Sequence, residues 1–446
     1  MPKQNVIIIG AAGRDFHNFN TWYRNNENYN VVAFTAAQIP GIESRKYPAE
    51  LAGENYPEGI PIYLQDELAL LIPKLNADIC TFAYSDISYQ EVMSVSAIVN
   101  AAGADFLLLG PAHTQLKSKR PVIAVGAVRT GCGKSKTSGR IVSILNNRGI
   151  KVVAIRHPMP YGDLELQKVQ RYESIEDLEK NNCTIEEMEE YEHYVTGGNV
   201  IYSGADYQAI LGEAEKEADI ILWDGGNNDF PFIRPDLMIT VTDPHRVGHE
   251  LSYFPGEVNL RKADIVVINK IDSANPDNVQ LLRENIRKVN SDAVVVDAAY
   301  PVLAADPEVI RGKRVLVIED GPTTTHGNMK VGPGIFAAKK FGASQLVDPR
   351  PYLVGRLKET FETYPEIGTL LPAMGYGREQ IKDLEQTINN TDCDAVIIAT
   401  PIDLGRVVRI NKPSTRVNYD LQEIGKPDLD ELIGSFLERE GITGRI

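Results

Sequence analysis

Cysteine, positive charge and long apolar runs are all scarce in this sequence. The four cysteines, at positions 80, 132, 183 and 393, follow no metal-ligand spacing. Their scatter argues against a disulfide framework or a cysteine zinc site and indicates a reducing, cytoplasmic setting. Acidic residues outnumber basic ones by 61 to 46, for a formal net charge of -15, so we expect no general attraction to nucleic acid or anionic membranes. No apolar run reaches transmembrane length, and we expect no signal peptide.

The remaining composition is that of an ordinary globular protein. With 446 residues, of which 43% are hydrophobic, the chain is long enough to bury the cores of two or three α/β domains. Because the net charge is negative, any phosphate ligand has to be held by local basic groups.

A glycine-rich turn between a predicted strand and a predicted helix is the strongest functional signal. Apolar residues from Val122 lead to Gly126, and helical spacing begins at Lys136 and ends before Gly149. The turn reads Arg-Thr-Gly-Cys-Gly-Lys-Ser over residues 129–135. In a phosphate-binding loop, backbone N–H groups and the helix N-terminus hold phosphate oxygens, a lysine approaches the β- and γ-phosphates, and a serine ligates Mg²⁺. We predict that the nucleotide phosphates bind Gly131, Cys132, Gly133, Lys134, Ser135 and Lys136.

The loop departs from the usual pattern, because Val128 stands where that pattern has its first glycine. It resembles instead the variant loop of dethiobiotin synthetase, nitrogenase iron protein and the metallochaperone GTPases. Arg129 occupies the position at which some of those proteins carry a second basic residue.

Polar residues also follow later predicted strands. One strand ends in Arg156 and His157, and another ends in Asp224. Since parallel strands gather their carboxyl ends at one edge of a sheet, where α/β proteins bind ligands, we expect these residues near the loop. We predict that Arg156 and His157 hold negative groups of an acceptor, and that Asp224 binds Mg²⁺ with Ser135.

The element Asn269-Lys-Ile-Asp272 follows a further buried strand. An asparagine amide and a carboxylate at this spacing can contact the edge of a purine base. Taken alone the element favours GTP, whereas in dethiobiotin synthetase-like relatives an equivalent asparagine serves adenine, so both bases stay open.

Weaker signals lie elsewhere in the chain. Residues 164–196 are rich in Glu and Tyr and predict exposed acidic helices, one of them capped by Thr184 and Glu187. Several polar residues follow strands or lie on glycine-rich loops and are candidate contacts to an anionic substrate: Arg14, His17, His245, Arg246, His326 and Lys330.

The order of these elements predicts an α/β protein with three regions. Residues 1–118 alternate strands and helices and predict a Rossmann-like parallel sheet. Residues 119–300 predict a P-loop nucleotide-binding domain. Residues 301–446 continue in α/β style and are expected to complete the active site.

Five phrases together resemble the cyclic 2,3-diphosphoglycerate synthetase family. They are the loop itself, Arg-His-Pro-Met-Pro-Tyr-Gly-Asp-Leu at 156–164, Glu-Asp-Gly-Pro-Thr-Thr-Thr-His-Gly at 319–327, Leu-Pro-Ala-Met-Gly-Tyr at 371–376 and Thr-Pro-Ile-Asp-Leu at 400–404. The likeness extends over nearly the whole chain. It implies a homodimeric enzyme that uses ATP and Mg²⁺ to phosphorylate one phosphate of 2,3-diphosphoglycerate, after which the other phosphate closes a cyclic pyrophosphate.

In that mechanism catalysis comes mainly from positioning and charge neutralisation, by Lys134, Arg129, Arg156 and His157. Two other functions fit the motifs. One is the same activation of a different acceptor, such as a carboxylate converted to an acyl phosphate that then cyclises or is ligated. The other is a regulatory or metal-delivery GTPase, although the metal-binding Cys or His cluster usual in such proteins is missing.

Overall fold

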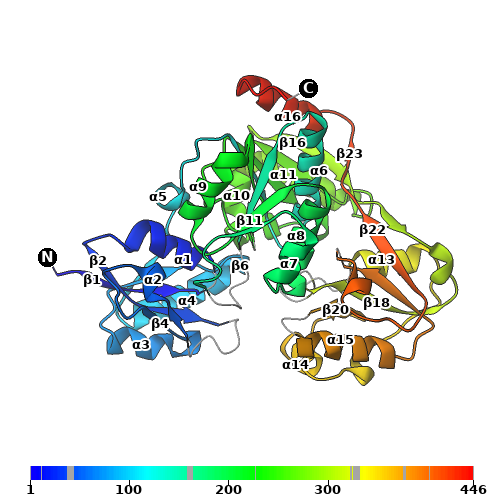
Figure 1. Cartoon of the computed structure of the whole chain (residues 1–446), viewed down its shortest axis with the longest axis horizontal. Helices are drawn as coiled ribbons and strands as arrows, with labels where there is room; N and C mark the ends of the chain where they lie inside the picture. Colours follow the sequence, from blue (N-terminus) through cyan, green and yellow to red (C-terminus); the bar gives the residue numbers. More distant parts are fainter. Residues whose placement is uncertain are drawn as a thin grey trace.

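The computed structural model describes residues 2–11, 13–37, 45–157, 164–226, 228–321, 324, 332–374, 378–400 and 402–444. Within these residues the strands form three large, mainly parallel sheets and one two-stranded ribbon. Helices flank the three sheets, and the first and third lie on opposite sides of the central one (Figure 1). The predicted α/β class is confirmed.

The first sheet has the order β3-β4-β2-β1-β5-β7, and only β3 runs antiparallel to its neighbour. Its strands are β1 (Gln4–Ile9), β2 (Tyr29–Ala36), β3 (Lys46–Tyr47), β4 (Ile60–Leu64), β5 (Ile79–Phe82) and β7 (Asp105–Leu107). Val6 and Ile8 pack with Phe16 of α1 (Arg14–Asn18), while Ile7 packs on the opposite side with α3 (Leu68–Lys74) and α4 (Tyr89–Ala101). Alternate residues of β1 are therefore buried on both faces.

The central sheet has the order β10-β11-β9-β12-β8-β13-β15-β16-β23. Its strands are β8 (Val122–Ala127), β9 (Val152–Arg156), β10 (Gln170–Tyr172), β11 (Val200–Ser203), β12 (Ile220–Trp223), β13 (Leu237–Thr242), β15 (Ile265–Ile268), β16 (Val294–Ala299) and β23 (Gln422–Ile424). Only the edge strands β10 and β23 are antiparallel. The loop at 129–133 follows the central strand β8, so the ends of its neighbours β12 and β13 lie on either side of it.

The third sheet has the order β17-β22-β21-β18-β19, with β20 also paired to β18. Its strands are β17 (Val302–Ala304), β18 (Arg314–Asp320), β19 (Gln345–Leu346), β20 (Leu371–Ala373), β21 (Ala395–Ala399) and β22 (Ser414–Tyr419). Helices α13 (Pro333–Lys340), α14 (Leu357–Thr363) and α15 (Arg378–Asn390) accompany it (Figure 1).

The end of the chain differs from the expected division at residue 300. After β22 the chain returns to the central sheet, where β23 pairs with β16 and α16 (Leu429–Arg439) packs its apolar residues into the central core. Leu429, Ile433 and Phe436 supply that contact, and their spacing places them on one helix face. The segment predicted to belong wholly to the third region therefore serves two sheets.

The acidic helices of residues 164–196 are less exposed than predicted. The capping box of Thr184 and Glu187 is confirmed at the start of α8 (Ile185–Thr196). Glu189 and Tyr194, however, are among the buried residues of that helix, because α8 lies between the central and third sheets (Figure 1). In the described part of the chain, no helix is both long enough and apolar enough to cross a membrane.

Candidate active site

The predicted phosphate loop joins β8 to α6 (Lys134–Asn147). Gly131 and Gly133 have φ values of 81° and 106°. A side chain at either position would strain the left-handed backbone, which explains glycine there. Residue 133 immediately precedes α6, so the turn delivers its backbone to the positive end of that helix.

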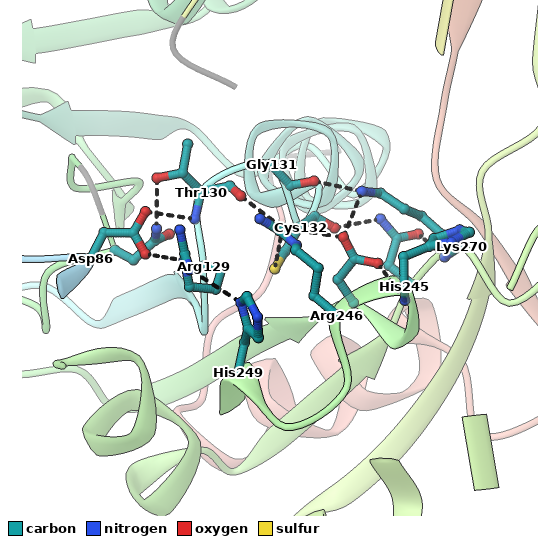
Figure 2. Close-up of polar contacts among 12 residues, drawn as sticks. Asp86, Arg129, Thr130, Gly131, Cys132, His245, Arg246, His249 and Lys270 are labelled. Carbon is teal, nitrogen blue, oxygen red and sulfur yellow. Dashed lines mark hydrogen bonds and ion pairs between the residues drawn. The ribbon is translucent and has the colours of Figure 1, made fainter. Parts of the chain in front are cut away.

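Side chains from two neighbouring strand ends hold the loop by three successive carbonyl oxygens (Figure 2). Arg246 donates to the Thr130 oxygen at 2.8 Å, and Lys270 donates to the Gly131 oxygen at 2.6 Å. The amide of Asn269 donates to the Cys132 oxygen at 2.8 Å. These side chains occupy the carbonyl oxygens of the loop. We infer that the N–H groups at the start of α6 remain available to phosphate oxygens.

A shared carboxylate neutralises the two cations of this support. Asp243 Oδ2 lies 2.9 Å from Lys270 Nζ and 3.2 Å from Arg246 Nη2. Burial opposes ionisation of Asp243, but the neighbouring Lys270 and Arg246 outweigh it and lower its pKa to about 2. The contacts correct two predictions: Arg246 supports the loop rather than a substrate, and Asn269, which is fully buried, supports it rather than a base.

Arg129 points away from the phosphate site. Its Nε lies 2.7 Å from Asp86 Oδ1, its guanidinium stacks 3.7 Å from the centre of the Tyr253 ring, and it donates to His249 at 3.1 Å. Asp86 also accepts from the Thr130 N–H at 3.3 Å (Figure 2). The predicted catalytic role of Arg129 is therefore corrected to a structural one, an ion pair between the first region and the loop.

Lys134 and Asp224 meet at the end of β12. Lys134 Nζ lies 2.9 Å from Asp224 Oδ1, and Arg156 Nη1 lies 2.7 Å from Asp224 Oδ2. Burial works against the charge of Asp224, yet Lys134 and Arg156 hold its pKa well below the usual range. Burial, with the nearby Arg156, lowers the pKa of Lys134 to about 8. The cluster thus places two cations next to the loop, with their charge balanced by Asp224 and Glu190.

Of the two predicted magnesium ligands, Ser135 is placed to bind a metal ion and Asp224 is not. Ser135 lines the cavity beside Lys134, where a hydroxyl suits a hard cation. Both oxygens of Asp224 are occupied by donors: Ser138 at 2.5 Å, Tyr194 at 2.8 Å, and the two cations. Direct ligation by Asp224 would displace Lys134 or Arg156, so Ser135 fits the metal and Asp224, as arranged, does not. No group of three His, Cys, Asp or Glu residues suited to a metal occurs among the described residues.

A cavity of about 910 Å³ opens beside the loop, between the central and third sheets. Predicted residues that line it are Gly131, Gly133, Lys134, Ser135, Lys136, Arg156, His245 and Asp272. Asp272 accepts from the Tyr300 N–H at 2.9 Å, and His245 contacts the Ser273 hydroxyl at 3.0 Å. Both remain candidate ligand contacts.

Arg14 and His17 lie where the first region packs against the central one. Arg14 is buried against Asp229 at 3.3 Å, with the rings of Phe230 and Phe254 about it. His17 bonds the Thr114 oxygen at 2.8 Å, and burial lowers its pKa to about 3. The predicted substrate role of these two residues is corrected to packing.

His157 is also buried, 3.6 Å from Asp229, and it is not among the residues that line the cavity. A Cβ on Gly13 would lie 2.2 Å from its ring, so the first region closes over it. The predicted acceptor role of His157 is therefore corrected to an interdomain contact. His326 and Lys330 lie outside the described residues.

Sequence analysis missed the residues that α8 and the third sheet contribute to the cavity. Glu189, Glu190 and His193 come from α8, and Glu319 with Asp320 from the end of β18. Glu190 forms an ion pair with Arg156. The i, i+4 spacing of Glu189 and His193 was a usable signal, but a charged helix was interpreted as a solvated face.

Comparisons with known proteins place the chain in a family. No protein-family model matches it. Arginine synthetase ArcE of Thermococcus kodakarensis is 61% identical over 431 residues, which cover 97% of this chain and 96% of that protein. A cyclic 2,3-diphosphoglycerate synthetase of Thermococcus sibiricus is 29% identical over 111 residues, 24% of this chain and 25% of that protein. The expected likeness to the latter family is thus confirmed only over part of the chain.

Among solved structures, LpxK of Aquifex aeolicus in complex with ATP aligns with a TM-score of 0.43 at 11% identity, covering 82% of this chain and 99% of LpxK. A score this low adds nothing to the argument. The full-length match at high identity is decisive, and the chain belongs to the family of arginine synthetase ArcE.

Proposed function

We propose that this protein is an ATP- and Mg²⁺-dependent synthetase that forms arginine. The observation that carries the proposal is a cavity at the phosphate loop that is also lined by acidic side chains, in a chain 61% identical to an arginine synthetase. The phosphate loop with Lys134 and Arg156 lines this cavity, and so do the carboxyl groups of Glu189 and Glu319. The loop and its cations suit the triphosphate of a nucleotide, and carboxyl groups can form hydrogen bonds with the nitrogen groups of an acceptor.

The chemistry of a guanidinium group indicates the reaction. It differs from a ureido group by a nitrogen in place of the oxygen, and a ureido oxygen is a poor leaving group. In the proposed reaction the ureido oxygen of citrulline attacks the γ-phosphorus of ATP and the β–γ P–O bond breaks, which releases ADP. Ammonia then attacks the ureido carbon, the C–O bond breaks, and phosphate leaves. The sum is citrulline, ammonium and ATP giving arginine, ADP, phosphate and one proton.

The chain's own residues contribute charge and position to this reaction. The helix terminus at Lys134 and the loop amides hold phosphate oxygens, and Lys134 moves from Asp224 to the transferring phosphoryl group. Arg156 stays on Asp224 and keeps that carboxylate ionised. Mg²⁺, when bound by the Ser135 hydroxyl, supplies further charge neutralisation.

The partial match to a cyclic 2,3-diphosphoglycerate synthetase favours a second candidate, ring closure of 2,3-diphosphoglycerate. That match covers 24% of this chain, whereas the match to the arginine synthetase covers 97%. We therefore place it second. The homodimer and the cytoplasmic location stay proposals.

Purified protein with Mg²⁺ and either ATP or GTP tests the proposal against its alternatives. We expect arginine and ADP in equal amounts only when citrulline and ammonium chloride are both present, with ATP preferred. Cyclic pyrophosphate formation from 2,3-diphosphoglycerate, followed by ³¹P NMR, would support the second candidate. Slow GTP hydrolysis that ignores both acceptors would support a regulatory GTPase.

A further inference from the structure

Asn228 lies on the turn that follows β12 and has no role in the reaction as described so far. It is 4% exposed and lines the cavity, and its φ of 57° places the backbone in the left-handed region, which asparagine tolerates. Asn259 of α10 (Gly256–Lys262) donates to the Asn228 backbone oxygen at 2.9 Å. A neighbouring helix therefore holds the backbone of this turn without help from the Asn228 side chain.

The amide of Asn228 is fixed through its nitrogen, whereas its oxygen has no partner. Asn228 Nδ2 donates to the Thr130 hydroxyl oxygen at 3.0 Å. Thr130 is itself held, because its N–H donates to Asp86 and its carbonyl oxygen accepts from Arg246 (Figure 2). In the part of the chain that the structure describes, no group donates to Asn228 Oδ1. A ligand in the cavity can supply the missing donor.

The position of this turn in the sheet places Asn228 on the acceptor's side of the loop. At the start of the turn, Lys134 Nζ lies 2.9 Å from the Gly225 oxygen. In the central sheet β12 lies on one side of β8, whereas β15, which precedes the candidate base contact Asp272, lies on the other side. The attacking and leaving oxygens of a phosphoryl transfer lie roughly in line. We therefore expect the acceptor to approach the γ-phosphorus from the side of β12.

The ureido group is the part of citrulline that has to reach this place. It is planar and uncharged, and its nitrogens carry N–H donors next to the oxygen that attacks phosphorus. An asparagine amide is also uncharged, and its oxygen accepts such N–H groups. Asp224, at the start of the same turn, is already occupied by Lys134 and Arg156, so its carboxylate does not compete for the ureido group.

We infer that Asn228 Oδ1 accepts a hydrogen bond from the terminal ureido nitrogen of citrulline, and that Thr130 holds the amide in this orientation. Asn228 is then a substrate-binding residue and Thr130 a positioning residue. The inference rests on the proposed function and names the group that recognises its acceptor.

This hydrogen bond becomes stronger as the phosphoryl group is transferred. A lone pair of the ureido oxygen forms the bond to the γ-phosphorus, and the electron pair of the β–γ P–O bond leaves with ADP. The positive charge that results is shared by the ureido carbon and its two nitrogens. Their N–H groups become better donors, so Asn228 Oδ1 stabilises the transition state more than the bound substrate.

The variant Asn228→Gly tests the inference, because glycine adopts the left-handed backbone freely and only the amide is lost. Calorimetry with a non-hydrolysable ATP analogue present should show affinity for citrulline reduced by about tenfold, and affinity for the analogue itself changed by less than about twofold. Asn182→Gly is the matched control. Asn182 has a φ of 53°, is exposed and does not line the cavity, so this variant should bind both compounds normally.

The compound Nδ-acetylornithine separates the hydrogen bond from a structural effect. It has the carbonyl group of citrulline, with a methyl group in place of the terminal NH₂. We expect the unaltered protein to bind it about tenfold more weakly than citrulline, and Asn228→Gly to bind it as well as the unaltered protein does. An equal loss of affinity for both compounds in Asn228→Gly would overturn the inference.

Two variants of Thr130 test its positioning role. Thr130→Val removes the oxygen that accepts from Asn228, so it should weaken the binding of citrulline. Thr130→Ser keeps a hydroxyl group and should restore most of that affinity. Equal affinity for citrulline in the two variants would overturn the role of Thr130.

The outcomes distinguish this inference from the proposed function. If the unaltered protein makes no arginine from citrulline and ammonium, the proposed function is wrong, and the inference is overturned with it. If arginine forms but Asn228→Gly binds citrulline as the unaltered protein does, only the inference is overturned. An equal fall in affinity for the ATP analogue and for citrulline would also overturn it, because the turn would then serve the nucleotide.

Discussion

At the scale of single residues, Lys134 and Asp224 form the contact on which the nucleotide site depends. The lysine is held by a carboxylate that also binds Arg156, Ser138 and Tyr194. Three donors remain on Asp224 when Lys134 leaves it. The lysine can therefore move to a phosphate group while the buried carboxylate of Asp224 keeps its other partners.

Lys134→Ala should therefore abolish activity and preserve the fold. We expect kcat/KM for ATP to fall by at least ~10³-fold, since a charge next to the transferring phosphoryl group is lost. Steady-state kinetics measure the loss of activity, and circular dichroism checks that the fold is preserved. Lys151→Ala, at a half-exposed ion pair with Glu217, is the control and should leave both unchanged. Retained turnover in Lys134→Ala would contradict the account.

Glu319 should make the stability of the protein depend on pH. Its pKa is raised to about 8 by burial, so between its usual value and pH 8 the folded state binds more protons than the unfolded state. The stabilising contribution is complete at low pH and is lost as the pH rises through 8. Urea unfolding at pH 5.5 and 8.5 should show a smaller loss of stability in Glu319→Gln than in the unaltered protein. An equal loss would show that Glu319 ionises normally.

At the scale of elements, the loop 129–133 depends on the strand ends beside it. The residues after β13 and β15 supply Arg246, Lys270 and Asn269, each bonded to a loop carbonyl. They act on the nucleotide through the loop that they support.

Lys270→Met should weaken ATP binding by about tenfold, because the Gly131 carbonyl loses its donor. Asp243 keeps Arg246 as a partner, so we expect the protein to fold. Binding of an ATP analogue by calorimetry provides the measurement, and Lys288→Met on the exposed face of α11 (Pro276–Val289) provides the control. Unchanged affinity would mean that the loop keeps its shape unaided.

Helices and strands with a strong local sequence pattern could be predicted from the sequence. The roles of individual side chains could be predicted less often. The strand, turn and helix around Lys134 follow from apolar runs and glycine positions, and all three are present. The role of Asn269 could not be predicted, because its side-chain amide donates to the Cys132 oxygen at 2.8 Å, a contact that the sequence does not show. The burial of α8 was missed because its neighbour, the third sheet, lies more than 100 residues further along the chain.

At the scale of the whole molecule, the first region is tied to the catalytic loop. Asp86 pairs with Arg129 and with the Thr130 N–H, and β6 (Ile87–Ser88) pairs with β14 (Tyr253–Phe254) of the central region. Arg129 was predicted to contact substrate because its sequence position borders the loop, whereas its partner comes from another region.

Asp86→Ala should lower both stability and ATP affinity. Removing one member of a buried ion pair typically costs about 3–5 kcal/mol, because the other charge is left without a partner. We expect a lower melting temperature and a higher KM for ATP, and the double variant Asp86→Ala with Arg129→Met should recover part of the stability. Asp66→Ala, at an exposed position of the same region, is the control. No recovery in the double variant would argue against the pair.

The most direct test of the whole account follows the ureido oxygen. Citrulline labelled with ¹⁸O in its ureido group is incubated with the protein, ATP, Mg²⁺ and ammonium chloride, and the phosphate formed is examined by ³¹P NMR and mass spectrometry. If the ureido oxygen is phosphorylated and then leaves with phosphate, each phosphate carries one ¹⁸O and ADP carries none. Unlabelled phosphate, or no arginine at all, would contradict the account.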